Sequence, residues 1–256
     1  MSTTVPAFNV LETTIDDIHS AYKSGQLTAR QLVQTYLDRI DAYNKRGPAI
    51  NAIITLNPNA LDEADRLDRA FKTAGPVGPL HGIPIIIKDQ ADAKGMPTTL
   101  GSVLFKDYYP DRDAFVVEKL KNAGAIILAK ATLGELGGGD THGSLFGSTR
   151  NPYDPERTAG GSSGGSGASV AANFCTAALG QEGFASIRRP STWNSIAGMR
   201  PTPCQSRRRV RGLAIHRRIS RSHVPHRYRL GKAIGRYGRL RSRRSYYRKR
   251  RRPNTR

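Results

Sequence analysis

The chain has 256 residues, enough for one sizeable domain, and its 41 basic and 20 acidic residues give a formal net charge of +21. Residues 204–256 hold 19 Arg and 2 Lys and no acidic residue, so residues 1–203 hold 20 residues of each sign. The charge therefore excludes a nucleic-acid or membrane-surface function for the neutral body, and only the last 53 residues carry a basic signal.

The N-terminal sequence lacks the basic and apolar regions of a signal peptide. No apolar run reaches the roughly 18 residues that a bilayer-spanning helix needs. Two cysteines, Cys175 and Cys204, are too few for a disulfide framework and are typical of a reducing compartment. We expect a soluble, cytoplasmic protein with no membrane partner.

Apolar residues at helical spacing predict three helices in residues 1–75, an N-terminal helical segment. The first helix ends at Gly25, and the second begins at the capping box Thr28–Gln31. The third spans Ala60–Phe71. These apolar faces indicate packing rather than chemistry.

The periodicity changes in residues 76–203, the expected catalytic core. The β-branched run Ile83–Ile87 predicts a buried strand that ends at Lys88, and Ala125–Lys130 predicts a second strand. Thr132–Glu135 is a capping-box start for a further helix. Strands alternating with helices favour an α/β fold around a largely parallel or mixed sheet.

A glycine- and serine-rich loop, Gly160–Gly167, precedes the small-residue stretch Ala168–Leu179, which predicts a closely packed helix. The composition of the loop fits a flexible linker, although the loop lies between segments that are expected to be ordered. It lacks the lysine of a phosphate-binding P-loop. Gly160–Gly164 matches a nucleophile elbow, but that motif needs an acid and then a histidine downstream, and the only histidines after Ser162 lie in the basic tail.

A serine nucleophile activated by a lysine is the remaining interpretation. A lysine acts as a base only when neutral, so burial or a neighbouring positive charge must lower its pKa. Lys88 ends an apolar strand, where an amine would be desolvated. The alternative is that Lys88 reaches solvent from the strand end or pairs with Asp89, and composition alone favours this alternative.

Five blocks, in order, resemble the signature blocks of the amidase-signature family. They are Gly78–Asp89, Asn151–Asp154, Gly160–Gly167, Ser186–Ser191 and Ala197–Thr202. The resemblance covers roughly residues 10 to 203. It implies an amidase-signature fold, in which helices cover both faces of a mixed central sheet, with a C-terminal part that this chain lacks.

The resemblance also implies a catalytic triad with no metal and no organic cofactor. Lys88 would be the base, Ser162 a serine in a cis peptide bond that relays the proton, and Ser186 the nucleophile that forms an acyl-enzyme. The oxyanion hole would consist of the backbone N–H groups of Gly183, Phe184, Ala185 and Ser186.

The turn before Ser186 departs from the family pattern. It reads Gln-Glu-Gly-Phe-Ala-Ser, whereas the family has Thr-Asp-x-Gly-Gly-Ser. Phe184 and Ala185 replace two glycines, which keeps the N–H donors but restricts their torsions. Glu182 keeps the acid one methylene longer. We interpret the chain as a variant subgroup with an intact nucleophile, in which Phe184 narrows the acyl pocket.

The tail, residues 204–256, has no amphipathic pattern and is unlike the family. An abrupt switch to arginine-rich, acid-free sequence is what an out-of-frame reading of a GC-rich coding sequence gives, and this frameshift is the leading interpretation. The alternative is a genuine nucleic-acid-binding tail. We also expect the truncated sheet to leave an apolar edge and face uncovered, which puts folding and activity in question.

Three functions follow from the sequence. The favoured one is an amidase that hydrolyses the C–N bond of a small-molecule amide. The second is the amidase-like subunit of a glutamine-dependent tRNA amidotransferase, and the third is a nucleic-acid-binding protein that acts through its tail. The neutral body and the unusual turn Gln181–Ala185 favour the first.

Overall fold

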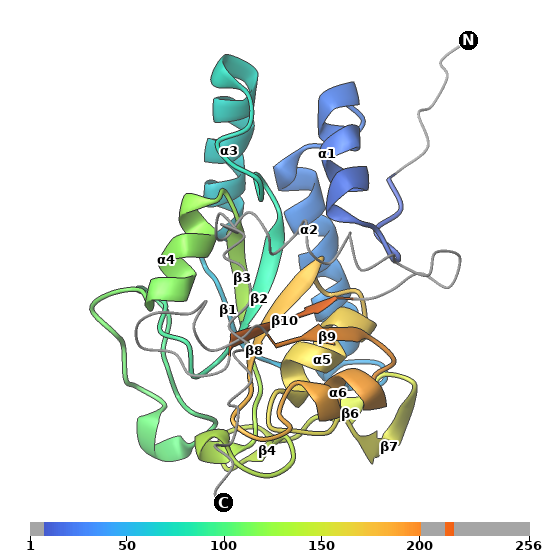
Figure 1. The fold of residues 1–256 in the computed structure, drawn as a ribbon, viewed down its shortest axis with the longest axis vertical. Helices are drawn as coiled ribbons and strands as arrows, with labels where there is room; N and C mark the ends of the chain where they lie inside the picture. The colour runs from blue at the N-terminus through green and yellow to red at the C-terminus, as the bar shows by residue number, and fades with distance from the viewer. Residues whose placement is uncertain (1–7, 201–212, 218–256) are drawn as a thin grey trace, which may run out of the picture. The chain divides into compact units, whose positions relative to one another are not determined.

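The computed structural model describes residues 8–200 and 213–217 (Figure 1). By its internal contacts the chain forms two units, Met1–His223 and Val224–Arg256, and every described residue lies in the first. The α-helices are α1 (Ile15–Ser24), α2 (Ala29–Ile40), α3 (Ala60–Ala74), α4 (Phe115–Asn122), α5 (Gly164–Ala171) and α6 (Arg188–Trp193). Shorter helical turns are the π-helix η1 (Asp41–Lys45) and the 3₁₀ turns η2 (Val103–Phe105) and η3 (Glu135–Gly137).

A mixed sheet of six strands, in the order β1-β3-β2-β8-β10-β9, forms the centre of this unit. Its strands are β1 (Ile53–Leu56), β2 (Pro84–Lys88), β3 (Ile126–Ala131), β8 (Ala177–Gln181), β9 (Ala197–Met199) and β10 (Leu213–Arg217). Strand β2 runs parallel to β3 and β8, and the other pairings are antiparallel. Two small hairpins pair β4 (His142–Gly143) with β5 (Gly147–Ser148) and β6 (Arg150–Asn151) with β7 (Asp154–Thr158). The predicted α/β fold around a mixed sheet is confirmed.

The two neighbouring parallel strands β2 and β3 are buried along their whole length. Helix α5 packs against β2 and β8, while α3 and α4 pack against β3. Strands covered in this way read as continuous apolar runs, which is why Ile83–Ile87 was recognisable. The prediction that this strand carries Lys88 at its end is confirmed.

Two of the predicted helix boundaries near the N-terminus are also confirmed, while α3 extends three residues beyond the predicted end at Phe71. Helix α1 ends at Gly25, which adopts the left-handed conformation with φ of 74°. Thr28 and Gln31 form a reciprocal capping box at the start of α2. The segment 1–75 is not purely helical, however, because β1 pairs with β3 and so adds an edge strand to the described sheet.

The helix predicted from Thr132–Glu135 is wrong. The Thr132 hydroxyl, which a capping box would use, bonds instead to the carbonyl oxygen of Ala52 and to the Thr149 hydroxyl. Leu136 then takes a positive φ of 54°, which is incompatible with an α-helix, and only the short turn η3 forms.

The helix predicted over Ala168–Leu179 is partly wrong. Helix α5 begins four residues earlier, within the glycine- and serine-rich loop, and ends at Ala171. Asn173 has a positive φ of 54°, and the chain then continues as β8. All eight residues of α5 are buried, so the small side chains serve close packing, as expected.

The tail contains one described element that the sequence did not predict. Strand β10, at Leu213–Arg217, pairs antiparallel with both β8 and β9. The rest of the segment 204–256 lies outside the described residues. The frameshift and nucleic-acid hypotheses concern this segment and therefore stay predictions.

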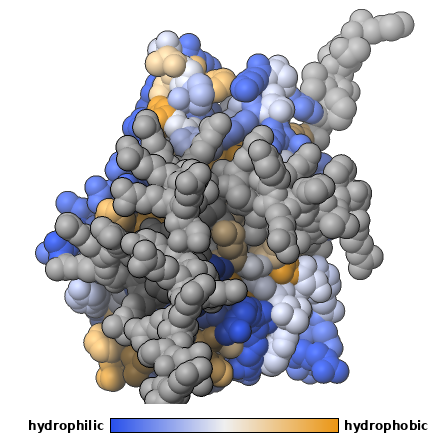
Figure 2. Space-filling model, in the orientation of Figure 1, coloured by the Kyte–Doolittle hydropathy of each residue, from blue (hydrophilic) through white to orange (hydrophobic). Residues whose placement is uncertain are grey.

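Where the face drawn in Figure 2 is coloured, hydrophilic areas predominate and separate hydrophobic areas lie between them. Several large apolar side chains are exposed near η2, among them Leu104 at 83% and Tyr109 at 61%. In the described part of the chain, no helix combines the length and the hydrophobicity that a membrane crossing requires.

Aromatic rings from α1, from α3 and from the segment before β2 pack together. The His81 ring lies 5.3 Å from the Phe71 ring and 6.3 Å from the Tyr22 ring, measured between centroids. His81 is buried, and its Nδ1 accepts a hydrogen bond from the backbone N–H of Val77. Burial lowers the pKa of His81 below its ordinary value of 6.5.

We therefore expect stability to fall as the pH drops below about 6.5. A lowered folded-state pKa means that the unfolded chain binds a proton to His81 more readily than the folded chain, so acid favours unfolding. The free energy of urea unfolding, measured from pH 7.5 to 5, should decline less in His81→Asn, which retains an acceptor but does not titrate. Parallel curves for the two proteins would contradict this expectation.

Candidate active site

Lys88 lies in the interior at the end of β2. Its side chain is 1% exposed, so it does not reach solvent. Its Nζ donates a 2.8 Å hydrogen bond to Ser162 Oγ. Burial lowers the pKa of Lys88 from 10.5 to about 7, because a charged ammonium is poorly solvated there. At neutral pH a large fraction of this amine is therefore neutral.

The alternative pairing of Lys88 with Asp89 is wrong, because Asp89 lies in the turn after β2 and its carboxylate has other partners. The Asp89 carboxylate accepts hydrogen bonds from the N–H and hydroxyl of Thr99. It also lies 3.8 Å from the Nζ of the buried Lys130. Lys130 donates to Thr98 Oγ1 and to the carbonyl oxygen of Pro97. This second lysine, which the sequence analysis missed, is a paired charge that anchors the loop after β2.

Ser162 sits in the loop that leads into α5. The peptide bond Gly161–Ser162 is cis, and the side chain of Ser162 is 2% exposed. Ser162 Oγ accepts from Lys88 and donates a 2.8 Å hydrogen bond to Ser186 Oγ. The three side chains identified from the sequence thus form one continuous hydrogen-bonded chain, drawn from β2, the loop before α5 and the turn before α6.

Ser186 belongs to the turn that joins β8 to α6, and Glu182 holds this turn. The buried carboxylate of Glu182 accepts from the backbone N–H groups of Ile187 and Arg188 and from Arg188 Nε, at 2.7–2.9 Å. Burial opposes ionisation, but these N–H donors and the Arg188 charge prevail and lower the pKa of Glu182. The Arg188 guanidinium also donates to the carbonyl oxygen of Phe184.

The turn offers backbone donors beside the Ser186 hydroxyl. Within the residues that the structure describes, the N–H groups of Gly183, Phe184, Ala185 and Ser186 make no hydrogen bond. The Phe184 side chain is 88% exposed, so it does not fill the interior beneath the turn. The predicted oxyanion donors are therefore available to a ligand, and the aromatic ring stands outside the packed core.

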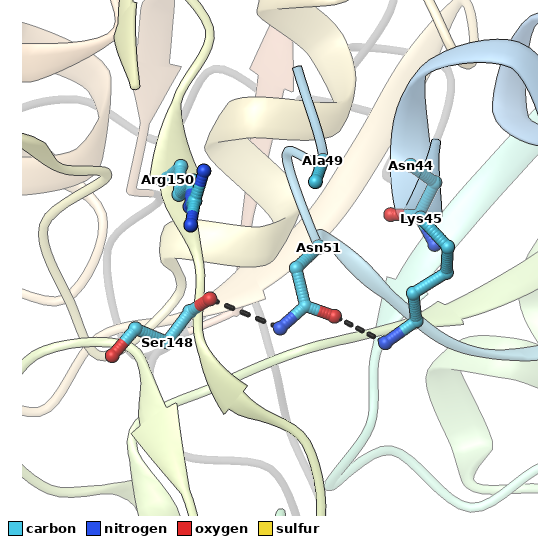
Figure 3. Close-up of a pocket in the computed structure, with 6 residues that line it drawn as sticks. All are labelled: Asn44, Lys45, Ala49, Asn51, Ser148 and Arg150. Atoms are coloured by element: carbon cyan, nitrogen blue, oxygen red, sulfur yellow. Dashed lines mark hydrogen bonds between the residues drawn. The ribbon is translucent and has the colours of Figure 1, made fainter. Parts of the chain in front are cut away.

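A separate hollow of about 360 Å³ lies elsewhere on the surface and holds none of these three side chains (Figure 3). It is lined by Asn44, Lys45, Ala49, Asn51, Ser148 and Arg150. Asn51 bridges its two sides, donating to the carbonyl oxygen of Ser148 and accepting from Lys45 Nζ. The hollow lacks a buried base beside its hydroxyl group, so it does not compete with the Ser186 site.

Among the described residues, no three or more His, Cys, Asp or Glu side chains form a cluster that could hold a metal ion.

Comparison with known proteins gives consistent matches. The sequence model of the Amidase family matches residues 31–218. A glutamyl-tRNA(Gln) amidotransferase subunit from Lawsonia intracellularis (strain PHE/MN1-00) is 44% identical over 187 residues, which are 72% of this chain and 38% of that protein. The corresponding subunit from Prochlorococcus marinus (strain NATL2A) is 39% identical over 191 residues, or 74% and 39%.

Solved structures agree with the sequence matches. The native peptide amidase from Stenotrophomonas maltophilia has a TM-score of 0.75 and 36% identity, over 78% of this chain and 42% of that one. Fatty acid amide hydrolase has a TM-score of 0.75 and 25% identity, over 84% and 40%. The chain thus spans about two fifths of the length of these relatives. The family match also extends past residue 203, where the resemblance was expected to end.

The Glu182 carboxylate should be the main structural support of the turn. We expect Glu182→Ala to lower the free energy of unfolding by about 2–4 kcal/mol, because it leaves the backbone N–H groups of Ile187 and Arg188 without their acceptor. Glu156→Ala, at an exposed position, is the control and should change it by less than about 0.5 kcal/mol. Equal small effects in urea unfolding would show that the carboxylate does not hold the turn.

Proposed function

Because this chain belongs to the amidase-signature family, we propose that it is the catalytic part of an amidase, which hydrolyses the C–N bond of a carboxylic amide. The observation that carries the proposal is the pair of 2.8 Å hydrogen bonds that links Lys88 Nζ to Ser162 Oγ and Ser162 Oγ to Ser186 Oγ. The chain spans about two fifths of the length of its relatives. The proposal therefore concerns the catalytic residues and does not define the substrate-binding pocket.

The proposed reaction begins with neutral Lys88. With the amine neutral, the two hydroxyl groups rotate so that Ser186 Oγ donates to Ser162 Oγ and Ser162 Oγ donates to Lys88 Nζ along the same two contacts. Ser186 Oγ attacks the carbonyl carbon, its proton passes to Ser162 Oγ, and the Ser162 proton passes to Lys88 Nζ. The proton then returns along the same path to the leaving amine as the C–N bond breaks. Water attacks the resulting ester by the same relay and releases the acid. A lysine pKa of about 7 suits both directions of transfer near neutral pH.

The negative charge that develops on the carbonyl oxygen needs donors already in place. The N–H groups of the turn 183–186 are the candidates, and the Glu182 carboxylate stabilises the turn that presents them. Because the donors are backbone groups, the Phe and Ala side chains that replace the family's glycines do not remove them. The exposed Phe184 would then contact the acyl group of the substrate.

A second candidate is the amidase-like subunit of a glutamine-dependent tRNA amidotransferase. It is supported by the identity of 39–44% to the glutamyl-tRNA(Gln) amidotransferase subunits of the two bacteria named above. Both candidates use the same three side chains and differ in the amide that they accept. A marked preference for L-glutamine over simple amides and peptide amides favours the second candidate.

The test is hydrolysis of a panel of simple amides, peptide amides and L-glutamine by the whole chain and two variants. Ser186→Ala should lower kcat about a thousandfold or more, because it removes the nucleophile. The exposed Ser20 bonds only to its own helix, and Ser20→Ala should match the unmodified protein. Equal rates for the unmodified protein and Ser186→Ala would overturn the assignment of the nucleophile.

A further inference from the structure

The loop that carries Ser162 is held by the neighbouring segment Gly139–Thr141. A Cβ atom on Gly161 would lie 2.2 Å from the carbonyl oxygen of Gly139. A Cβ atom on Gly164 would lie 2.2 Å from Thr141 Oγ1. Real side chains do not approach so closely, so both glycines are required by this contact. The loop and the segment therefore form one packed unit.

The Thr141 hydroxyl joins the two ends of the loop. Its Oγ1 donates a 2.7 Å hydrogen bond to the carbonyl oxygen of Gly160 and accepts a 2.8 Å hydrogen bond from the N–H of Gly164. Ser162 is midway between these two residues. Thr141 is 2% exposed, so water does not compete for either bond.

The same hydroxyl also caps α5. Gly164 is the first residue of that helix, and its N–H has no partner within the helix. The N-cap residue Ser163 makes no capping bond with its side chain. Thr141 supplies the missing acceptor from a different part of the chain, which fixes where the helix begins relative to Ser162.

We propose that Thr141 is a positioning residue for the relay of Lys88, Ser162 and Ser186. This inference rests on the function proposed above and adds a residue to it. By fixing Gly160 and Gly164, Thr141 sets the position of Ser162 Oγ between its two partners. Both relay hydrogen bonds are 2.8 Å long, and a displacement of Ser162 Oγ by about 1 Å would break them.

The test compares isosteric and conservative variants in the whole chain. Thr141→Val keeps the shape and removes both hydrogen bonds, whereas Thr141→Ser keeps the hydroxyl. Thr176→Val is the matched control, because Thr176 is also buried and bonds to the Tyr36 hydroxyl at the other end of β8. Each variant is measured for kcat, KM and urea unfolding, and its crystal structure gives the distance from Lys88 Nζ to Ser162 Oγ.

In Thr141→Val we expect that distance to exceed 3.5 Å and kcat to fall about 100-fold, with KM within about threefold. Thr141→Ser should restore the distance, and its kcat should lie within about fivefold of that of the unmodified chain. Thr176→Val should leave the distance and kcat unchanged. Loss of kcat at constant KM, rescued by serine, separates positioning from a general loss of stability.

A distance that stays near 2.8 Å in Thr141→Val would overturn the proposal, and it can be read whether or not the chain hydrolyses any amide. The proposed function fails separately, if Ser186→Ala is as fast as the unmodified chain. If Thr141→Val does not fold, Thr141→Ala replaces it. Failure of both to fold beside a folded Thr176→Val would show a purely structural role and would also overturn the proposal.

Discussion

The site depends on one constraint, the burial of the Lys88 amine at a place where, among the described residues, it bonds to a hydroxyl and forms no ion pair with a carboxylate. Removing a charge from water costs several kcal/mol unless an opposite charge is near, so the amine loses its proton readily. Lys130 shows the contrast, because its buried Nζ lies near the Asp89 carboxylate and keeps a higher pKa of about 8. The two roles separate where β2 ends, since Lys88, its last residue, bonds to Ser162 while Asp89, in the turn that follows, lies near Lys130.

Keeping Lys88 away from water also requires the backbone to pack closely around Lys88, Ser162 and Ser186. Helix α5 approaches β2 and β8 closely because its residues are small, and its first turn contacts Thr132 and Thr141 where any Cβ would clash. The turn at Ser186 is fixed differently, by the ionised Glu182 carboxylate that accepts from Ile187 and Arg188. Two buried polar groups thus orient the two serines: the Thr141 hydroxyl orients Ser162, and the Glu182 carboxylate orients Ser186.

Local signals predicted much of this arrangement. The capping box at Thr28–Gln31 and the apolar run before Lys88 mark a helix start and a buried strand by their own chemistry. The similar signal at Thr132–Glu135 failed because a tertiary partner, Ala52, takes the threonine hydroxyl. Strand β10 and the bonds of Thr141 were not predictable, since both depend on contacts between segments distant in sequence.

The central claim is that burial keeps a large fraction of Lys88 neutral at pH 7, and an NMR titration of the chain with ¹³Cε-labelled lysine tests it most directly. The Lys88 signal is identified by its absence in Lys88→Met, and Lys130 serves as an internal comparison. A Lys88 pKa of about 7, below that of Lys130, is the predicted result. A Lys88 pKa near the ordinary value of 10.5 would contradict the account, because the relay would then begin from a protonated amine.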